Sequence, residues 1–226
     1  MTQIKAVFFD WVGTLAHPEP DRHESVYQVA QGLGVELPAD KLQRAVYKAE
    51  NEVPAGAPGT WREGKDETPF IQWWQVLSSE VGVRIPKDIM LDITKRLSQM
   101  VRKARWVVYD DALPALSLLK QMGLSLGVIS NLYIGGGSLD ALLGLVVTAE
   151  DAKAGKPEPP IFLMALAKAS VSPAEVIYVG DQYQTDVIGA SRVGIKAILI
   201  DRYDIYPELI GCPIIHGLDE VIDYLQ

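Results

Sequence analysis

The chain has 226 residues, of which 48% are hydrophobic and 22% charged, and this balance is typical of a globular protein with a sizeable core. The net charge of -8 argues against nucleic acid as the main partner, because phosphate backbones are bound by basic surfaces. The sequence shows no membrane-spanning window and no signal-peptide pattern, and its single cysteine, Cys212, excludes an intramolecular disulfide. We therefore expect a cytoplasmic protein with a small-molecule substrate, no nucleic-acid or membrane partner, and a monomeric or homodimeric state.

The first predicted element is a short buried strand over residues 6–9, which runs directly into the sequence D-W-V-G-T-L at residues 10–15. A buried strand that ends in Asp10 places this carboxylate at the carboxyl edge of an open α/β sheet, where such sheets bind ligands. Gly13 then permits a sharp backbone turn, and Thr14 supplies a hydroxyl group. This stretch is the most informative part of the chain.

Residues 16–105 have a different character. A linker at residues 17–20, H-P-E-P, leads into four predicted helices with apolar residues at three- and four-residue spacing. These helices are predicted over residues 25–32, 40–52, 68–81 and 88–102, and the loop at 54–59, rich in proline and glycine, separates the second from the third. Trp73 and Trp74 are adjacent on the third helix, and we expect them mainly to pack this block, although one of them is an alternative candidate for lining a site or a dimer contact.

From Trp106 onward strands and helices alternate. Strands are predicted over residues 124–129, 145–148, 176–179 and 196–200, and helices over 111–122, 138–143, 161–170, 186–193 and 218–225, the first of them capped by Asp111. Near-continuous apolar strands that alternate with helices indicate a parallel sheet covered on both faces. The predicted fold class is therefore α/β.

Three polar clusters follow Asp10 along this alternating part. Ser130 and Asn131 come at the end of the strand after residue 124, and Lys156 stands immediately before a predicted helix in the sequence G-K-P-E-P. Asp181 follows the strand that ends at residue 179, and Asp186 comes five residues later. Each cluster taken singly has an ordinary explanation as a turn, a helix cap or a surface charge.

Taken in order, the four clusters resemble the four motifs of the haloacid dehalogenase (HAD) superfamily, whose first motif reads D-x-D-G-T. The resemblance implies a Rossmann-like core domain over residues 1–15 and 106–226, and a helical cap domain of the first type over residues 16–105. It also implies a hydrolase that acts through a covalent intermediate on Asp10. The implied catalytic residues are Asp10, Ser130 and Lys156, the substrate-binding residues are Ser130, Asn131 and Lys156, and the Mg²⁺ site comprises Asp10, the carbonyl of Val12, Asp181 and, behind them, Asp186.

The chain departs from this superfamily's phosphatases at Val12, which replaces the second aspartate of the first motif. In those phosphatases this aspartate protonates the leaving oxygen and later activates water, and valine does neither. Positioned acid–base catalysis is worth roughly 10²–10⁴ in rate, or about 3–5 kcal/mol of barrier. The metal site is expected to survive because it uses only the carbonyl of Val12.

Three functions remain open on these residues. The first is a Mg²⁺-dependent phosphatase of small metabolites with weakened acid–base catalysis, for which His17 is a candidate substitute acid, although its position also fits an exposed linker histidine. The second is carbon-group chemistry, as in the 2-haloacid dehalogenases, for which Arg44 and Arg62 are candidate substrate ligands. The phosphonoacetaldehyde hydrolases, whose motif reads D-W-A-G-T, are similar at the first motif and need a cap lysine, for which Lys41 or Lys48 is available. The third is a degenerate member that binds a phosphorylated ligand without turnover.

Overall fold

The chain folds as two compact units, Met1–His17 with Val108–Gln226 and Pro18–Val107. The computed structural model describes residues 3–132, 135, 137–206 and 211–225. The sequence predicted the two crossings between the units at residues 15/16 and 105/106, and the contacts place them at 17/18 and 107/108. None of the helices in these described segments is both long and apolar enough to cross a membrane.

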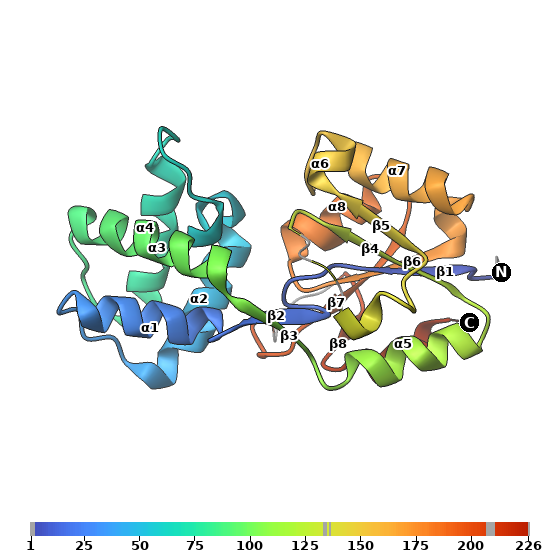
Figure 1. Ribbon diagram of the computed structural model, residues 1–226, viewed down its shortest axis with the longest axis horizontal. Helices are drawn as coiled ribbons and strands as arrows, with labels where there is room; N and C mark the ends of the chain where they lie inside the picture. Colours follow the sequence, from blue (N-terminus) through green and yellow to red (C-terminus); the bar gives the residue numbers. More distant parts are fainter. Residues whose placement is uncertain (1–2, 133–134, 136, 207–210, 226) are drawn as a thin grey trace. The chain divides into compact units, whose positions relative to one another are not determined.

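The first unit contains a six-stranded sheet in the order β5-β4-β1-β6-β7-β8, and every pairing in it is parallel (Figure 1). Its strands are β1 (Ala6–Phe9), β4 (Ser125–Ser130), β5 (Leu145–Thr148), β6 (Val176–Gly180), β7 (Lys196–Ile200) and β8 (Ile214–Ile215). All four residues of β1 are buried, as expected for a strand covered on both faces. The predicted parallel α/β sheet is confirmed.

The strand order changes direction beside β1. The chain runs from β1 to β4 and β5 on one side, and then returns to β6, β7 and β8 on the other. β1 therefore lies between β4 and β6, with Phe9 opposite both Val128 and Val179. In open parallel sheets such a reversal leaves a crevice at the carboxyl ends of the two strands, where ligands bind. The crevice in this sheet is expected just beyond Phe9 and Gly180.

Helices cover both faces of the sheet, with α5 (Ala112–Gln121) on one side and α6 (Ala149–Ala152), α7 (Pro159–Ala169) and α8 (Ile188–Ser191) on the other (Figure 1). The second face is held by an apolar cluster that includes Phe8, Phe162 and Tyr178. Asp111 takes the predicted position before α5, but its side chain does not cap the helix. Its carboxylate instead accepts hydrogen bonds from Arg202 and from the backbone of Leu218.

Three predicted helices of this unit have a different form. The helix expected over residues 138–143 is a single 3₁₀ turn, Gly137–Leu139, because the neighbouring glycines have low helix propensity. The one expected over 186–193 begins as a π-helical turn, Tyr183–Val187, and continues as the short α8. The expected C-terminal helix is a 3₁₀ helix, Leu218–Tyr224.

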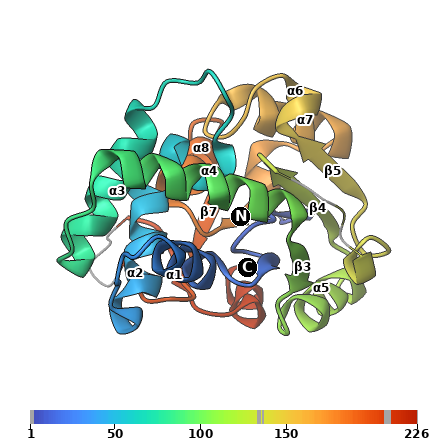
Figure 2. The ribbon, with the colours of Figure 1, turned by 60° about the vertical axis from the view of Figure 1, so that its left-hand side comes forward.

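The second unit consists of four helices, α1 (Arg22–Gly32), α2 (Ala39–Glu52), α3 (Thr68–Val81) and α4 (Lys87–Lys103) (Figure 2). A capping box between Asp21 and Glu24 starts α1. Trp73 and Trp74 are both fully buried in the apolar core of this unit, where the indole of Trp74 donates to Thr94. Both tryptophans therefore pack the unit, and neither lines a surface. The predicted loop at 54–59 contains two 3₁₀ turns, Pro54–Gly56 and Pro58–Thr60.

The two crossing segments form a small sheet of their own, in which β2 (Ala16–Glu19) pairs with β3 (Arg105–Val108). Residues 17–20 were expected to be an irregular linker, and no strand was predicted at 105–108. The pairing joins segments almost ninety positions apart, so neither segment carries a local signal for it. Pro18 is tolerated because each strand has only one neighbour.

Candidate active site

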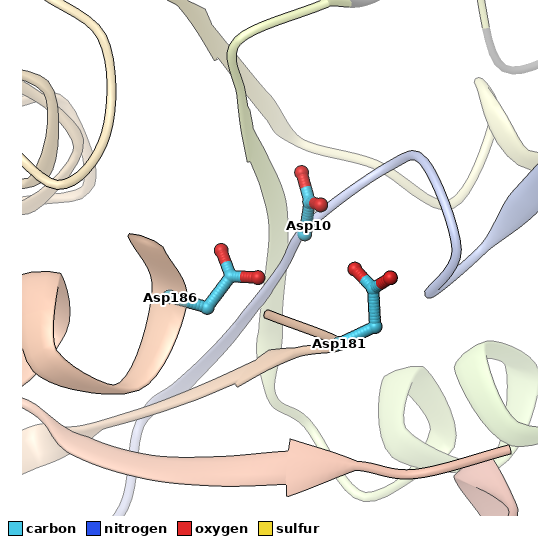
Figure 3. Close-up of side chains that lie close together, drawn as sticks. All are labelled: Asp10, Asp181 and Asp186. Atoms are coloured by element: carbon cyan, nitrogen blue, oxygen red, sulfur yellow. The ribbon is translucent and has the colours of Figure 1, made fainter. Parts of the chain in front are cut away.

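Two aspartates lie side by side at the point where the strand order reverses. Asp10 follows β1 directly and Asp181 follows β6 directly, and the backbone N–H of Asp10 donates to the carbonyl of Val179 at 2.8 Å. Oxygens of Asp10, Asp181 and Asp186 all lie within 4.8 Å of one another, and all three residues are buried. Figure 3 shows the three carboxyl groups turned toward a common space. The structure therefore brings together the three carboxylates that the sequence indicated.

Asp186 reaches this cluster from the π-helical turn after β6. Its Oδ2 accepts a hydrogen bond from the backbone N–H of Gln182 at 2.9 Å, which fixes the carboxylate against the start of the turn. The approach to the strand is so close that a Cβ atom on Gly180 would lie 2.3 Å from the Asp186 Cγ. Glycine at position 180 is therefore a steric requirement of the site. A π-helical turn at such a place is common in functional sites.

Lys156 is the cation of the cluster. Its Nζ lies 2.6 Å from Asp10 Oδ1 and 2.6 Å from Asp186 Oδ1, and its side chain is only 3% exposed. Burial alone would lower the pKa of Lys156, but the carboxylates of Asp10 and Asp186 outweigh burial and raise it above its ordinary value. Burial also raises the pKa of Asp186. The ammonium therefore stays charged and bridges the carboxylate that follows β1 and the carboxylate on the π-helical turn after β6.

Tyr178 completes the surroundings of Lys156 and was not recognised from the sequence. Its hydroxyl accepts from Lys156 Nζ at 3.0 Å, lies 2.9 Å from Asp186 Oδ1, to which it donates, and lies 3.2 Å from the carbonyl of Ile129. Burial and the neighbouring carboxylates hold the pKa of Tyr178 well above its ordinary value, so the phenol remains a neutral donor. The only signal in the sequence is a tyrosine inside an apolar strand, whose hydroxyl needs a buried partner.

Ser130 and Asn131 lie at the end of β4, next to β1. Ser130 is buried, and its hydroxyl donates to the carbonyl of Leu132 at 2.8 Å. The side-chain amide of Asn131 makes two hydrogen bonds to the backbone of Lys156. It accepts one from the N–H at 2.7 Å and donates one to the carbonyl at 3.1 Å. A Cβ atom on Gly155 would lie 2.7 Å from Asn131 Oδ1, so this pair of hydrogen bonds also requires a glycine before the lysine. Asn131 therefore orients the loop that carries Lys156, a role that the motif alone did not indicate.

Val12 lies in the tight turn that follows Asp10. Backbone hydrogen bonds close this turn from Gly13 to Ala16 at 2.8 Å and from Leu15 to Trp11 at 3.0 Å, and Gly13 adopts a φ of 83° that favours glycine. The side chain at position 12 is an alkyl group, which holds no proton to give. The His17 ring packs against the Tyr109 ring at 4.8 Å between centroids.

The residues of the second unit proposed for other chemistries have ordinary surroundings within that unit. Lys48 Nζ lies 2.6 Å from Glu80 Oε1, and Arg62 donates to the carbonyls of Gly59 and Trp61 at 3.1 and 2.7 Å. Lys41 and Arg44 are exposed. An ion-paired lysine is less available as a Schiff-base nucleophile than one held neutral in an apolar pocket.

The donor set beyond the ends of β1 and β6 fits a divalent cation. Three carboxylates and one ammonium leave two formal negative charges in excess, and oxygen ligands of this kind suit Mg²⁺. Both oxygens of Asp186 already accept hydrogen bonds, Oδ1 from Lys156 and Tyr178 and Oδ2 from Gln182. Asp10 and Asp181 are therefore the carboxylates best placed to touch a cation, with Asp186 holding Lys156 behind them.

Comparisons with known proteins identify relatives of this chain. The model of the haloacid dehalogenase-like hydrolases matches residues 4–194. The chain is 29% identical to the glyceraldehyde 3-phosphate phosphatase of Methanopyrus kandleri over 88% of this chain and 84% of that protein. It is 26% identical to the (S)-2-haloacid dehalogenase 4A of Burkholderia cepacia over 96% of this chain and 92% of that protein. The crystal structure of a HAD phosphatase from Thermococcus onnurineus superposes with a TM-score of 0.58 at 25% identity, covering 98% of both chains. The chain is therefore a hydrolase that belongs to the haloacid dehalogenase-like family, as its four ordered motifs predicted.

Proposed function

We propose that this hydrolase is a Mg²⁺-dependent phosphatase of small phosphorylated metabolites. Asp10 is the proposed nucleophile, and Val12 occupies the position of the usual general acid. The observation that carries the proposal is the bridge of Lys156 between Asp10 and Asp186, at 2.6 Å from each, beside Asp181. An ammonium and a divalent cation around one carboxylate are the arrangement that an attack on an anionic phosphoryl group needs. The phosphatase relatives support the same choice.

In this proposal one carboxylate oxygen of Asp10 attacks phosphorus and the leaving oxygen departs, which forms an aspartyl phosphate that water then hydrolyses. Lys156 holds Asp10 in place and offsets the charge that accumulates on the phosphoryl oxygens. Ser130 and the backbone at Asn131 are proposed donors to those oxygens. Bound Mg²⁺, held by Asp10, Asp181 and the carbonyl of Val12, would supply further positive charge at the phosphoryl group.

The lack of a proton donor at position 12 restricts which leaving groups the enzyme can expel. With Val12 in the turn, no carboxylic acid is available at that position to protonate the leaving oxygen. Substrates whose leaving group is stable as an anion, such as acyl phosphates and phosphate esters of acidic alcohols, are therefore favoured. Residues 18–107 would form the cap that selects among them, and a cytoplasmic monomer or homodimer is part of the same proposal.

Dehalogenation is the second candidate, and Val12 is the observation that favours it. A halide leaves without a proton, so a displacement by Asp10 at carbon needs no acid at position 12. The relative from Burkholderia cepacia that is named as a haloacid dehalogenase supports this alternative. Retention of Asp181 and Asp186 beside Asp10 argues for the phosphatase, because a halide displacement does not need a cation site. A phosphonoacetaldehyde hydrolase and a binding protein without turnover rank below both.

The test is a screen of acyl phosphates, aryl phosphates and sugar phosphates with and without Mg²⁺, run beside halide release from 2-haloacids. Wild type, Asp10→Asn and Val12→Asp are compared. We expect Mg²⁺-dependent release of phosphate by the wild type, abolished turnover in Asp10→Asn, and a gain in phosphatase activity in Val12→Asp. Halide release that is independent of metal would reverse the order of the two candidates. Turnover that survives in Asp10→Asn would contradict both.

A further inference from the structure

Arg202, whose side chain is largely buried, donates a hydrogen bond to the turn that carries Asp10. Residues 10–16, called here the Asp10 turn, are closed on themselves by the backbone hydrogen bonds described above. The carbonyl of Thr14 is not used in that closure, and it accepts a hydrogen bond from Arg202 Nη2 at 2.8 Å. Arg202 follows Asp201 at the end of β7, two strands away from β1 in the sheet.

The guanidinium of Arg202 is fixed on two further sides. Nη1 and Nη2 donate to the two carboxylate oxygens of Asp111 at 2.9 and 3.0 Å, which is a bidentate pair. The flat face of the guanidinium lies over the ring of Tyr109, with Cζ 4.0 Å from the ring centroid. The Arg202 side chain is only 12% exposed. These contacts leave the guanidinium of Arg202 little freedom to move. The Thr14 carbonyl, which is its third contact, is therefore also held in a defined position.

The partners of Arg202 are themselves tied to the fold. Asp111 Oδ2 also accepts from the backbone N–H of Leu218 at 2.9 Å, which links it to the start of the C-terminal 3₁₀ helix. The backbone N–H of Tyr109 donates to the carbonyl of Leu15 at 3.0 Å. The Asp10 turn is thus anchored at two successive carbonyls, Thr14 and Leu15, by residues that lie together.

We propose that Arg202 is a positioning residue for the proposed active site, which it serves by fixing the Asp10 turn through the Thr14 carbonyl. Asp10 begins this turn and Val12 lies within it, so the turn sets both the nucleophile and the carbonyl proposed for the metal. Displacement of a reacting group by about 1 Å costs about 10²-fold in rate. A lysine at position 202 has no fork with which to contact Asp111 and Thr14 together. The catalytic part of this inference rests on the proposed phosphatase function, whereas the anchoring of the turn does not.

Amide hydrogen exchange in peptides that cover residues 10–16 tests the anchoring directly. Arg202→Met removes the donors and keeps most of the apolar stem, and Arg202→Lys keeps a single donor group. We expect exchange in the Asp10 turn to rise about 10–100-fold in Arg202→Met, the range that loss of a hydrogen bond to a charged group gives, and to rise less in Arg202→Lys. Exchange in β4 and β5 is expected to stay unchanged in both variants.

Arg22→Met is a matched control. Arg22 is also mostly buried, with its side chain 11% exposed, pairs with Glu50, and stacks on the Tyr47 ring at 4.1 Å, but it belongs to the second unit. It is expected to lower the thermal midpoint to a similar extent without changing exchange in the Asp10 turn. Unchanged protection of the turn in Arg202→Met, or equal loss of it in Arg22→Met, would overturn the anchoring.

Steady-state kinetics test the consequence for catalysis. With an acyl phosphate and Mg²⁺, we expect Arg202→Met to lower kcat about 10–100-fold while KM changes little, and Arg202→Lys to recover part of the loss. A kcat within about twofold of the wild type in a folded Arg202→Met variant would overturn the positioning role, since a 1 Å displacement costs far more. A wild type without phosphatase activity would refute the proposed function, and the exchange experiment would still decide whether Arg202 anchors the turn. If Arg202→Met does not fold, Arg202→Lys supplies both readouts.

Discussion

The hydroxyl of Tyr178 accepts a hydrogen bond from Lys156 Nζ at 3.0 Å, inside a site where both residues are buried. An ammonium has three donors, and the other two are taken by Asp10 and Asp186 at 2.6 Å. Tyr178 therefore supplies the third acceptor and leaves Lys156 without an unused donor. Because the phenol also donates to Asp186, it links the lysine and one of its carboxylates. This closed arrangement restricts Lys156 to one position between β1 and the turn after β6.

Tyr178→Phe removes only the hydroxyl from this arrangement. Lys156 and Asp186 each lose a partner in a buried position, so the free energy of unfolding is expected to fall by about 1–3 kcal/mol. We also expect kcat to fall about tenfold or more with little change in KM, because Tyr178 is not among the residues proposed to contact the substrate. Tyr47→Phe is the control, since Tyr47 is buried and its hydroxyl contacts Asp21 at 3.2 Å within the second unit. An equal loss of kcat in both variants would contradict a specific role for Tyr178.

Lys156→Met leaves the buried carboxylates of Asp10 and Asp186 without their cation. Breaking a buried pair in this way is expected to cost about 3–5 kcal/mol in the free energy of unfolding, measured by urea denaturation without metal. Mg²⁺ is expected to restore part of the loss, because a cation that binds only the folded state stabilises it. Lys48→Met is the control: Lys48 pairs with Glu80 but is 36% exposed, so about 1 kcal/mol or less is expected there. Failure of Mg²⁺ to stabilise either wild type or Lys156→Met would speak against the proposed metal site.

Gly180→Ala tests the close approach of Asp186 to β6. The added methyl group would lie 2.3 Å from Asp186 Cγ, so the carboxylate must move away from Lys156. We expect a loss of about 1–3 kcal/mol in stability from overpacking, together with a large loss of activity. In the control Gly32→Ala the new methyl group meets nothing within 4 Å at the end of α1, and a gain of up to about 1 kcal/mol is expected there. Normal activity in Gly180→Ala would mean that the position of Asp186 is not critical.

Five of the six strands of the sheet were predictable because they are apolar runs bounded by turns and separated by helices, whereas the two-residue β8 was not predicted. The polar clusters that end β1, β4 and β6 follow from the same pattern, since the carboxyl ends of parallel strands meet at one edge. The pairing of β2 with β3 was not predictable, because each segment is short and its partner is distant in sequence. Residues 183–187 take a π-helical form in which Asp186 contacts Gln182 and Lys156, and no local propensity predicts this form.

Within the site, the residues that motifs do not mark were missed for a common reason. Tyr178 lies in an apolar strand and is counted as core until its hydroxyl is placed beside Lys156. Arg202 and Asp111 are separated by 91 positions, and each alone reads as a surface charge or a helix cap. Such partners become visible only when the fold brings them together. The roles assigned to Asp10, Ser130, Asn131, Lys156 and Asp181 stay predictions until they are tested by substitution.

Glu175 predicts a pH dependence of stability at the start of the sheet. Lys5 Nζ lies 2.5 Å from Glu175 Oε1, and the side chain and backbone of Ser172 also donate to this carboxylate. The side-chain contact with Lys5 is the largest cause that lowers the pKa of Glu175, from 4.5 to about 2. A depressed pKa means that the stabilisation is present above about pH 4.5 and is lost as the pH falls toward 2. Glu175→Gln is therefore expected to be less stable than the wild type at pH 7, with the difference reduced by salt and absent near pH 2, as measured by thermal unfolding. A difference that persists unchanged to acid pH would show that the carboxylate charge is not involved.

The proton donor that Val12 replaces predicts how the rate depends on the leaving group. Without an acid, the leaving oxygen departs with its full negative charge, so log kcat/KM should fall steeply as the pKa of the leaving alcohol rises along a series of aryl and alkyl phosphates. Val12→Asp introduces a carboxylic acid at the same position and should flatten this dependence. Its gain should reach roughly 10²–10⁴ for alkyl phosphates and be far smaller for acyl phosphates, whose leaving groups need no proton. Val12→Asn, which matches the size of the aspartate and offers no acidic proton, is the control and should keep the steep slope. Parallel slopes in wild type and Val12→Asp would mean that protonation of the leaving group is supplied from elsewhere, and His17 would then be the first residue to substitute.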